Sequence, residues 1–527
     1  MYEETAKPPA DFNYEMLLLM TFRNLLRLTA IAACAICASS AGWCEVRLPG
    51  MLGSHMVLQR EMPIHIWGWA TPGENVSVEF KGASRATAAD DLGKWSLYLP
   101  AESAGGPYQL TITGKNKIIL DDVLVGDVWF ASGQSNMEMP LRGWAGAPLQ
   151  NSAAEIANAN QPNMRLLIIH QKTSEFPLRD IDGSWTPCTP NTAANFSAAA
   201  YFFGRDLAAQ EHVPIGVIDS TWGGTVVEAW ISLDGLSADA SLMPAFADRA
   251  HMMDEQADAP ALLAKEHRED EAAKKAGLPP PSHVWKPNPT SWGPANLFNG
   301  MIAPATPFAI KGVIWYQGES NSRRDFAPMY ERLFPTLISD WRTQWHEGDF
   351  PFLFVQIANF KSAPHEGWAT IREAQRRTLS VANTAMAVTI DIGDPDNVHP
   401  ADKQTVGARL ALAARALAYG EQVEYSGPAF RQAAPDGQEM RVWFDHAGGG
   451  LNAKGGAIEG FEVAGEDHQF VKAEAHIDGN TVVVASPQVP APRYVRYGWE
   501  NAPVVNLFNS AGLPASPFTS ETEIPAP

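Results

Sequence analysis

Short, nearly continuous apolar runs along the central part of the chain restrict its fold more than any other feature. The first covers 122–132, and five more begin at positions 164, 215, 310, 351 and 386. Runs this short and this apolar are typical of strands buried on both faces, which occur in parallel sheets. Stretches with helical apolar spacing lie between and after them, at 198–210 and 403–420. The alternation predicts an α/β fold over residues 123–420: a three-layer α/β/α domain with a mostly parallel sheet.

Different patterns flank this domain and interrupt it. Residues 45–122 consist of short alternating segments broken by turn dipeptides such as Pro72-Gly73, and residues 421–527 return to that pattern. Even spacing of this kind predicts a β-sandwich-like domain at each end. Residues 238–282 are charged and helix-prone, which predicts a helical excursion on the surface of the α/β domain.

The first 44 residues have the features of an export signal. Arg23 and Arg27 precede the apolar stretch 28–42, which is shorter than the roughly 20 residues that a membrane span needs. We expect the signal peptide to be cleaved and the mature protein to be secreted or periplasmic. The sequence "IAAC", which ends at Cys34, leaves a lipoprotein open as an alternative. The true start codon and the cleavage position stay open, and no later apolar run predicts a membrane span.

Composition excludes several classes of partner. A net charge of −20 argues against binding to duplex nucleic acid, which needs a basic face. The chain has neither an HExxH motif nor clustered Cys and His residues, so we expect no metal. The glycine-rich segment 446–460 lacks a following helix and is not expected to cradle a phosphate, and we expect no cofactor. The sequence does not determine the oligomeric state.

A serine follows the first buried run at a position where open α/β sheets bind ligands. The segment is Gly133-Gln134-Ser135-Asn136. A strand-to-helix turn would expose the Ser135 hydroxyl and surround it with backbone N–H groups. Met137 stands where a GxSxG nucleophile elbow has its second glycine, so this is a different motif. A serine that only caps a helix remains the alternative.

The loop "DIGDPDNVHPADK", after the last buried run, contains a candidate base for that serine. Asp396 precedes His399 by three residues, so its carboxylate could accept from one imidazole nitrogen while the other faces the serine. Asp391 and Asp394 compete with Asp396 for this orienting role. A turn with an incidental histidine is the alternative.

Two further strand ends carry candidate donors for an oxyanion. Gly223 and Gly224 follow one run, where backbone N–H groups can approach an oxyanion without a side chain in the way. Gln317 ends another run and can offer its side-chain amide to the same space. A plain Gly-Gly turn is the alternative for the first loop. Glu319, two residues after Gln317, is expected to be a structural carboxylate or to orient His399.

The combined motifs "GQSNMEMP", "WGG", "WYQGESN" and "DxxHP" resemble those of the SGNH hydrolases, and specifically of the sialate O-acetylesterase family of carbohydrate esterases. The resemblance covers roughly residues 48–420 and is looser beyond. It implies that Ser135 is the nucleophile and His399 the base. It also implies an oxyanion hole made by the Ser135 backbone, a glycine of the Gly223-Gly224 pair and Gln317. Gln317 would replace the usual SGNH asparagine, which makes Asn321 a rival donor.

The same resemblance implies a carbohydrate O-acetylesterase, foremost a sialate 9-O-acetylesterase that works through an acetyl-serine intermediate. An acetylxylan esterase acting on plant polysaccharide fragments, a non-catalytic carbohydrate-binding protein, and a lipase or acyltransferase remain alternatives. Arg142 could pair with a sialate carboxylate, and tryptophans 144, 222 and 292 could stack on sugars or simply pack. The residues that we expect to contact substrate are Gln134, Asn136, Arg142, Trp222 and Glu319.

Overall fold

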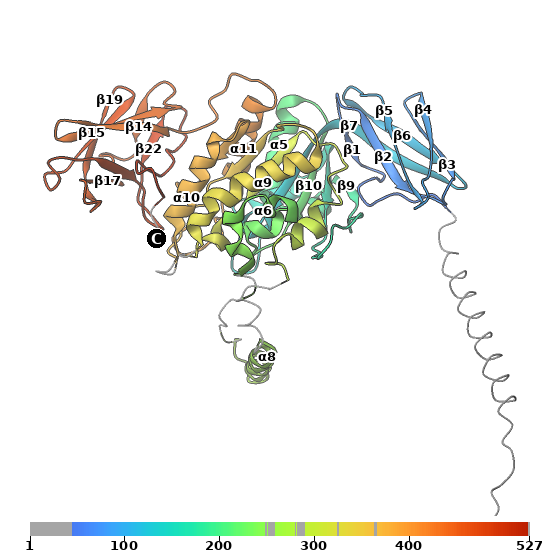
Figure 1. The fold of residues 1–527 in the computed structure, drawn as a ribbon, viewed down its shortest axis with the longest axis horizontal. Helices are drawn as coiled ribbons and strands as arrows, with labels where there is room; N and C mark the ends of the chain where they lie inside the picture. Colours follow the sequence, from blue (N-terminus) through green and yellow to red (C-terminus); the bar gives the residue numbers. More distant parts are fainter. Residues whose placement is uncertain are drawn as a thin grey trace, which may run out of the picture.

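The computed structural model describes residues 45–247, 250, 259–279, 281, 290–323, 326–362 and 366–524. The predicted signal peptide, within residues 1–44, lies outside these ranges. Along the described chain a β-rich part, a part with both helices and strands, and a second β-rich part follow one another (Figure 1). Across the ranges given above, no helix is long and apolar enough to cross a membrane.

A central sheet carries most of the predicted strands. Its strands, in the order in which they pair, are β13 (Thr384–Ala387), β12 (Phe352–Val355), β11 (Gly312–Tyr316), β7 (Lys117–Gly133), β10 (Ile215–Thr221), β8 (Gln161–Ile168) and β9 (Trp185–Cys188). All these pairings are parallel except that of β9, which runs antiparallel to β8. Every residue of β10 and β11 is buried: β11 is apolar throughout, whereas β10 ends in the buried polar residues Asp219, Ser220 and Thr221. The mostly parallel sheet is therefore confirmed.

The long helices pack on this sheet and on one another. α5 (Ala198–Glu211) lies against α11 (Lys403–Leu417), and α9 (Tyr330–Trp345) lies against α10 (Trp368–Arg377). Ser197 and Asp402 cap α5 and α11 by accepting from the N–H groups of Ala200 and Thr405. The shorter described elements of this part are α2 (Ser135–Glu138), α3 (Ser152–Ala157), α4 (Pro190–Ala193), η1 (Val227–Trp230), α6 (Leu233–Ser237), η4 (Phe298–Ile302), η5 (Glu319–Asn321), η6 (Ala327–Met329) and η7 (Thr378–Ser380).

The N-terminal β-rich part is continuous with the central sheet. Its strands are β1 (Val57–Gln59), β2 (Ile64–Trp69), β3 (Asn75–Phe80), β4 (Ala83–Ala88), β5 (Lys94–Leu99) and β6 (Gly105–Thr113). β7 is 17 residues long: its first half pairs with β6, and its second half pairs with β10 and β11. The predicted border between residues 122 and 123 thus falls inside one strand, and the apolar core runs across it.

The C-terminal β-rich part has antiparallel sheets and an apolar core of its own. Its strands are β14 (Ala429–Asp436), β15 (Glu439–Asp445), β16 (Leu451–Ala453), β17 (Phe461–Ala464), β18 (Val471–Lys472), β19 (Glu474–Asp478), β20 (Thr481–Ala485), β21 (Tyr494–Tyr497), β22 (Leu507–Asn509) and β23 (Phe518–Thr519). In the predicted excursion 238–282, the described residues form η2 (Ala240–Leu242) and the charged helix α8 (Ala259–Lys275), while 248–249, 251–258, 280 and 282 lie outside the described residues.

Candidate active site

Ser135 stands at the start of α2, directly after β7. Gly133 has φ +136, and a Cβ there would lie 2.2 Å from the Tyr316 carbonyl oxygen, so the turn requires glycine. The Gln134 N–H donates to that same carbonyl at 3.0 Å. Ser135 is partly exposed, and as a first helical residue it has no acceptor for its N–H within its own helix. No hydrogen bond in the described ranges takes up this N–H. The turn therefore presents a hydroxyl beside a free backbone donor.

The Gly223-Gly224 loop lies against this serine. A Cβ on Gly223 would lie 3.3 Å from the Ser135 Cβ. Gly224 has φ +71, and its carbonyl accepts from the Trp292 indole at 2.5 Å. Trp292 is buried and supports the loop, so its predicted alternative role as a packing residue is the one that the structure shows.

Glu138, which the sequence analysis did not single out, contacts the same loop. Its carboxylate accepts from the Gly223 N–H and, at 2.9 Å, from Gln171 Nε2. Burial raises the pKa of Glu138, and these two hydrogen bonds oppose that rise. The Gly223 N–H is therefore already engaged, whereas no hydrogen bond among the described residues takes up the Gly224 N–H. Of the two predicted glycine donors, Gly224 is the one that is free.

The structure contradicts the predicted donor role of Gln317. Its side chain is fully buried, and its Nε2 donates to the Thr225 carbonyl at 3.2 Å and to Asn321 Oδ1 at 2.7 Å. Both amide hydrogens are used, so none is left for an oxyanion. The rival donor Asn321 is also engaged, because its Nδ2 donates to Glu228 Oε2 at 2.9 Å. Both side chains brace the loop beneath the site.

Gln134 is better placed to donate than Gln317. Its Oε1 accepts from the Ser320 N–H at 3.1 Å and more weakly from the Gly318 N–H at 3.4 Å. Its Nε2 has no hydrogen-bond partner in the part of the chain that the structure describes. The sequence analysis placed Gln134 among the substrate contacts, and its neighbour in the turn is Ser135. The position of Gln134 directly before Ser135 was the sequence signal that it could donate to the oxyanion.

The loop after β13 brings His399 to the Ser135 turn. Val398, the residue before His399, accepts through its carbonyl from Asn136 Nδ2 at 3.0 Å, and Asn136 directly follows Ser135. The His399 ring lies edge-to-face on Trp144, with ring centroids 5.0 Å apart. Burial and, to a lesser extent, the positive charge of Lys403 lower the pKa of His399 to about 4. The imidazole is thus neutral near pH 7, which is the form a general base needs.

The structure gives no support to Asp396 as the residue that orients His399. The Asp396 side chain is 80% exposed and pairs with Lys361 at 3.0 Å. Asp391 makes a bidentate pair with Arg409, and Asp394 accepts from the Asp396 N–H. Within the described ranges, no hydrogen bond joins the imidazole to any of the three or to the Ser135 hydroxyl. The orienting role of Asp396 therefore stays a prediction.

Two predicted substrate contacts lie beneath the surface instead. Asn136 is almost fully buried and donates to Glu319 Oε1 at 2.5 Å, and Glu319 is buried as well. Asn136 Oδ1 accepts from Lys403 Nζ. Lys403, which the sequence analysis missed, begins α11. A lysine at a helix N-terminus opposes the helix dipole, and that mismatch was the available signal.

A cavity of about 340 Å³ opens beside the serine turn. It is lined by Glu138, Pro140, Arg142, Trp144, Ile168, Ile169, His170, Gln171, Asn195, Asp219 and Thr221. Arg142 is exposed, and no ion pair among the described residues engages it. Trp144 lines the cavity and also contacts the His399 ring, so one side chain separates the cavity from the candidate base. Trp222 is half-buried, and its backbone N–H donates to the Gly133 carbonyl.

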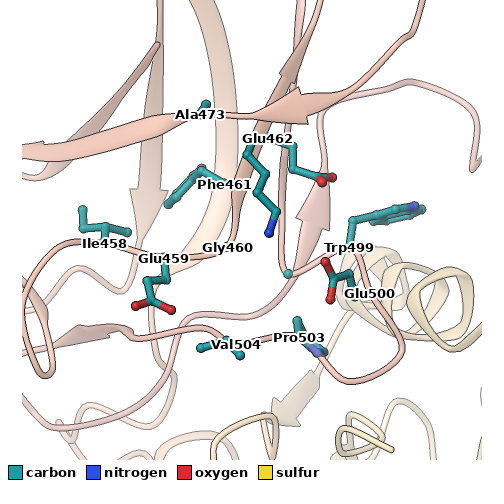
Figure 2. A pocket seen from close by; sticks show the side chains of 12 residues that line it. Ile458, Glu459, Gly460, Phe461, Glu462, Ala473, Trp499, Glu500, Pro503 and Val504 are labelled. Atoms are coloured by element: carbon teal, nitrogen blue, oxygen red, sulfur yellow. The ribbon is translucent and has the colours of Figure 1, made fainter. Parts of the chain in front are cut away.

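A second cavity, of about 400 Å³, lies in the C-terminal part (Figure 2). Glu459, Glu462, Glu500 and Trp499 line it, but neither a serine nor a histidine does. Across the described ranges, no group of three or more His, Cys, Asp or Glu side chains is arranged to hold a metal ion. The edge of the central sheet is the candidate active site because a hydrogen bond joins the Ser135 turn to the His399 loop there.

Comparisons with known proteins show the family to which the chain belongs. Residues 282–416 match a family model described as carbohydrate esterase, sialic acid-specific acetylesterase. The mouse sialate O-acetylesterase (Mus musculus) is 34% identical in an alignment 427 positions long, which covers 72% of this chain and 75% of the mouse protein. The human protein (Homo sapiens) is also 34% identical, over 72% of this chain and 73% of its own. The crystal structure of a carbohydrate acetylesterase from Xanthomonas citri superposes with a TM-score of 0.78 at 38% identity and covers 91% of this chain and 100% of its own.

Proposed function

Because the chain belongs to the sialate O-acetylesterase family and is therefore a carbohydrate esterase, we propose that it hydrolyses O-acetyl groups on sugars with Ser135 as nucleophile and His399 as base. The observation that carries this proposal is the Asn136–Val398 hydrogen bond, which holds the residues next to the serine and the histidine together. The free Ser135 N–H and the neutral imidazole supply the donor and base that acyl transfer requires.

In the proposed first half-reaction, His399 takes the proton of the Ser135 hydroxyl while the oxygen attacks the acetyl carbonyl carbon. The resulting oxyanion accepts from the N–H groups of Ser135 and Gly224 and from Gln134 Nε2. The bond between the carbonyl carbon and the sugar oxygen then breaks, and the imidazolium returns its proton to that oxygen. An acetyl-serine remains.

In the second half-reaction, water attacks the acetyl-serine and His399 takes the proton of the water. Collapse of the second tetrahedral intermediate releases acetate, and the proton returns to the Ser135 oxygen. No step uses a metal or a cofactor. Gln134 replaces Gln317 as the side-chain donor in this scheme, because both amide hydrogens of Gln317 are donated to Thr225 and Asn321.

For the sugar, we favour an O-acetylated sialic acid. The mouse and human relatives carry that specificity in their names, and the exposed Arg142 guanidinium lines the cavity beside the serine turn, where it can pair with a carboxylate. Acetylated xylan fragments are the second candidate, since the related Xanthomonas citri enzyme is described only as a carbohydrate acetylesterase. Relative kcat/KM on 9-O-acetyl sialic acid and acetylated xylo-oligosaccharides decides between them. Arg142→Ala should lower kcat/KM for the acidic sugar only.

Acetate release from both sugars by the wild type and by Ser135→Ala tests the chemistry. Ser152→Ala is a matched control, because that hydroxyl bonds only to the Leu141 carbonyl in the described structure. Loss of turnover in Ser135→Ala alone supports the esterase, whereas a wild type that binds acetylated sugar without releasing acetate supports a carbohydrate-binding protein instead.

The proposal extends to architecture and location. The parallel strand order supports the three-layer SGNH arrangement, and the antiparallel sheets at both ends support β-sandwich-like flanking domains. The apolar stretch at 28–42 supports a secreted or periplasmic enzyme. Sequencing the N-terminus of the exported protein tests the location, and a lipid on Cys34 would reveal a lipoprotein.

A further inference from the structure

Lys403 is a buried charge that the fold alone does not explain. Its side chain is only 1% exposed, and its Nζ lies 2.5 Å from Asn136 Oδ1 and 5.1 Å from the centre of the Tyr316 ring. Burying an ammonium group is unfavourable, and a positive charge at the N-terminus of α11 also opposes the helix dipole. An uncharged side chain would serve packing better at this position.

Glu319 compensates this charge through one intervening carboxamide. Asn136 accepts from Lys403 on its oxygen and donates to Glu319 Oε1 from its nitrogen, each at 2.5 Å. Burial lowers the pKa of Lys403 to about 7 and raises the pKa of Glu319, and each charge opposes the shift of the other. Glu319 Oε2 is buried without a hydrogen-bond partner in the described structure. The three side chains form one polar cluster under the site.

The cluster connects to both halves of the candidate site. The Asn136 carboxamide donates to Glu319 and also, at 3.0 Å, to the Val398 carbonyl. Asn136 adjoins Ser135, and Val398 adjoins His399. These two hydrogen bonds hold the nitrogen end of the carboxamide. The Lys403 ammonium holds the oxygen end, so it also fixes the direction of the bond to Val398.

Lys403 is also the charge that acts on the imidazole. The charged groups on the surrounding elements are Glu138 on α2, Glu319 on η5, Asp402 and Lys403 at the start of α11, and Asp391 with the exposed Asp394 and Asp396 on the histidine's own loop. Among them, only Lys403 contributes to the lowered pKa of His399. A nearby positive charge disfavours the imidazolium form.

We propose that Lys403 is a positioning residue of the esterase site: its ammonium group clamps the Asn136 carboxamide, which holds the His399 loop against the Ser135 turn. This inference rests on the proposed function, because it assigns His399 as the base. Lys403 touches neither the substrate nor the reacting atoms.

Three variants test the inference. Lys403→Met removes charge and donor, Lys403→Gln removes the charge but keeps an amide donor, and Lys311→Met is the control. Lys311 also lies over a tyrosine ring, 5.3 Å from the centre of Tyr419, but it precedes β11 at the end of the sheet away from Glu319. Circular dichroism and thermal unfolding establish that each variant is folded. Replacing a buried charge with an apolar residue is often tolerated, and Lys403→Gln carries the test if Lys403→Met does not fold.

The measurements are kcat and KM for p-nitrophenyl acetate across pH, and the pH dependence of Ser135 labelling by a fluorophosphonate. We expect Lys403→Met to lower kcat by about 10²-fold with little change in KM, because a small misplacement of a catalytic group has that effect. The acid limb of kcat/KM and of the labelling rate should move to higher pH in both Lys403 variants. The loss of kcat should be smaller in Lys403→Gln, and Lys311→Met should match the wild type.

A loss of kcat without movement of the acid limb would make Lys403 merely structural and overturn the inference, as would wild-type kinetics in both Lys403 variants. Failure of the proposed function looks different. In that case the wild type would not release acetate, or Ser135→Ala and His399→Ala would retain turnover, whatever the Lys403 variants do.

Discussion

The two halves of the candidate active site are held in different ways. The Ser135 turn continues β7, which is paired on both sides by β10 and β11 as far as Gly133, so backbone hydrogen bonds of the sheet fix it. The His399 loop lies well beyond the end of β13 and is only partly buried. Among the described residues, the Asn136–Val398 hydrogen bond joins it to the Ser135 turn, and the His399 ring also contacts Trp144. The nucleophile is thus placed by the sheet, whereas the base is placed beside it by side-chain contacts.

The largest loss of kcat is expected when the nucleophile or the base is removed. Ser135→Ala and His399→Ala should each lower kcat by about 10⁴-fold or more with the fold intact, because residues that act as one catalytic unit are about equally costly to lose. Acetate release and circular dichroism measure the two properties. Near-wild-type turnover in either variant would end the catalytic assignment.

The next largest loss is expected from a substitution that strains the Ser135 turn. Gly133→Ala would place a Cβ 2.2 Å from the Tyr316 carbonyl at a positive φ, so the turn must shift. We expect a stability loss of about 1–3 kcal/mol from such strain and a fall in kcat of about 10²-fold from the displaced serine. Denaturant unfolding and kcat measure these effects.

Gly437→Ala is the matched control for that variant. Gly437 also has a positive φ, but a Cβ there meets nothing within 4 Å, and it lies in the C-terminal part. It should lose some stability and keep its kcat. Equal losses of kcat in both variants would mean that the turn adapts easily.

The dependence of kcat/KM on pH reports on the protonation state of His399. A base must be neutral, so activity is present above the pKa of His399 and is lost as the pH falls through about 4. An ordinary histidine would already be about 97% protonated near pH 5, which corresponds to a loss of about 30-fold. We therefore expect kcat/KM at about pH 5 to remain close to its neutral value. An acid limb centred near the ordinary value of about 6.5 would contradict the burial of His399.

Trp144→Ala should moderately weaken the packing that holds the His399 ring. The variant removes the edge-to-face contact with His399 and part of the cavity wall. Aromatic pairs of this kind contribute about 0.5–1.5 kcal/mol, so we expect kcat/KM to fall about 3- to 10-fold. Trp144→Phe keeps a ring and should recover most of the activity. A fall in both variants alike would point to a role for the indole nitrogen.

The smallest expected effect concerns Asp396. Its exposed ion pair with Lys361 suggests that Asp396→Asn changes kcat by less than about 3-fold. A carboxylate that orients the imidazole would instead cost about 10²- to 10³-fold, less than the 10⁴-fold of the serine-protease case. The kcat of this variant therefore decides whether Asp396 orients the imidazole. Asp394→Asn tests the rival carboxylate on the same loop, and a large loss of kcat there would assign the orienting role to Asp394.

Local signals were sufficient for the elements that hold the nucleophile. The apolar runs predicted the strands of the central sheet because a strand buried on both faces must be apolar throughout. Gly133 before Ser135 predicted a sharp turn at a strand end, and the structure shows why only glycine fits there. The same rules predicted α5 and α11, whose apolar spacing is visible within one segment.

Local signals failed where a side chain's role depends on distant partners. Gln317 was expected to face substrate, but Thr225, Asn321 and Tyr330 take up its carboxamide. In the same way, a pattern with a period of two described the flanking β segments without showing that β7 joins the first of them to the central sheet.

The sequence by itself determined the α/β pattern, the strand-end position of Ser135, the place of His399 in the loop after the last strand of the sheet, and the family resemblance. Only the tertiary structure decided which polar groups are buried and which are free. Asn136 meets Lys403 across 267 residues and Glu319 across 183. A buried polar group must find a partner, and the partner is set by how the loops converge rather than by the residues beside it in the chain. That is why the same four-residue segment holds both a predicted nucleophile and a carboxamide whose task the sequence did not show.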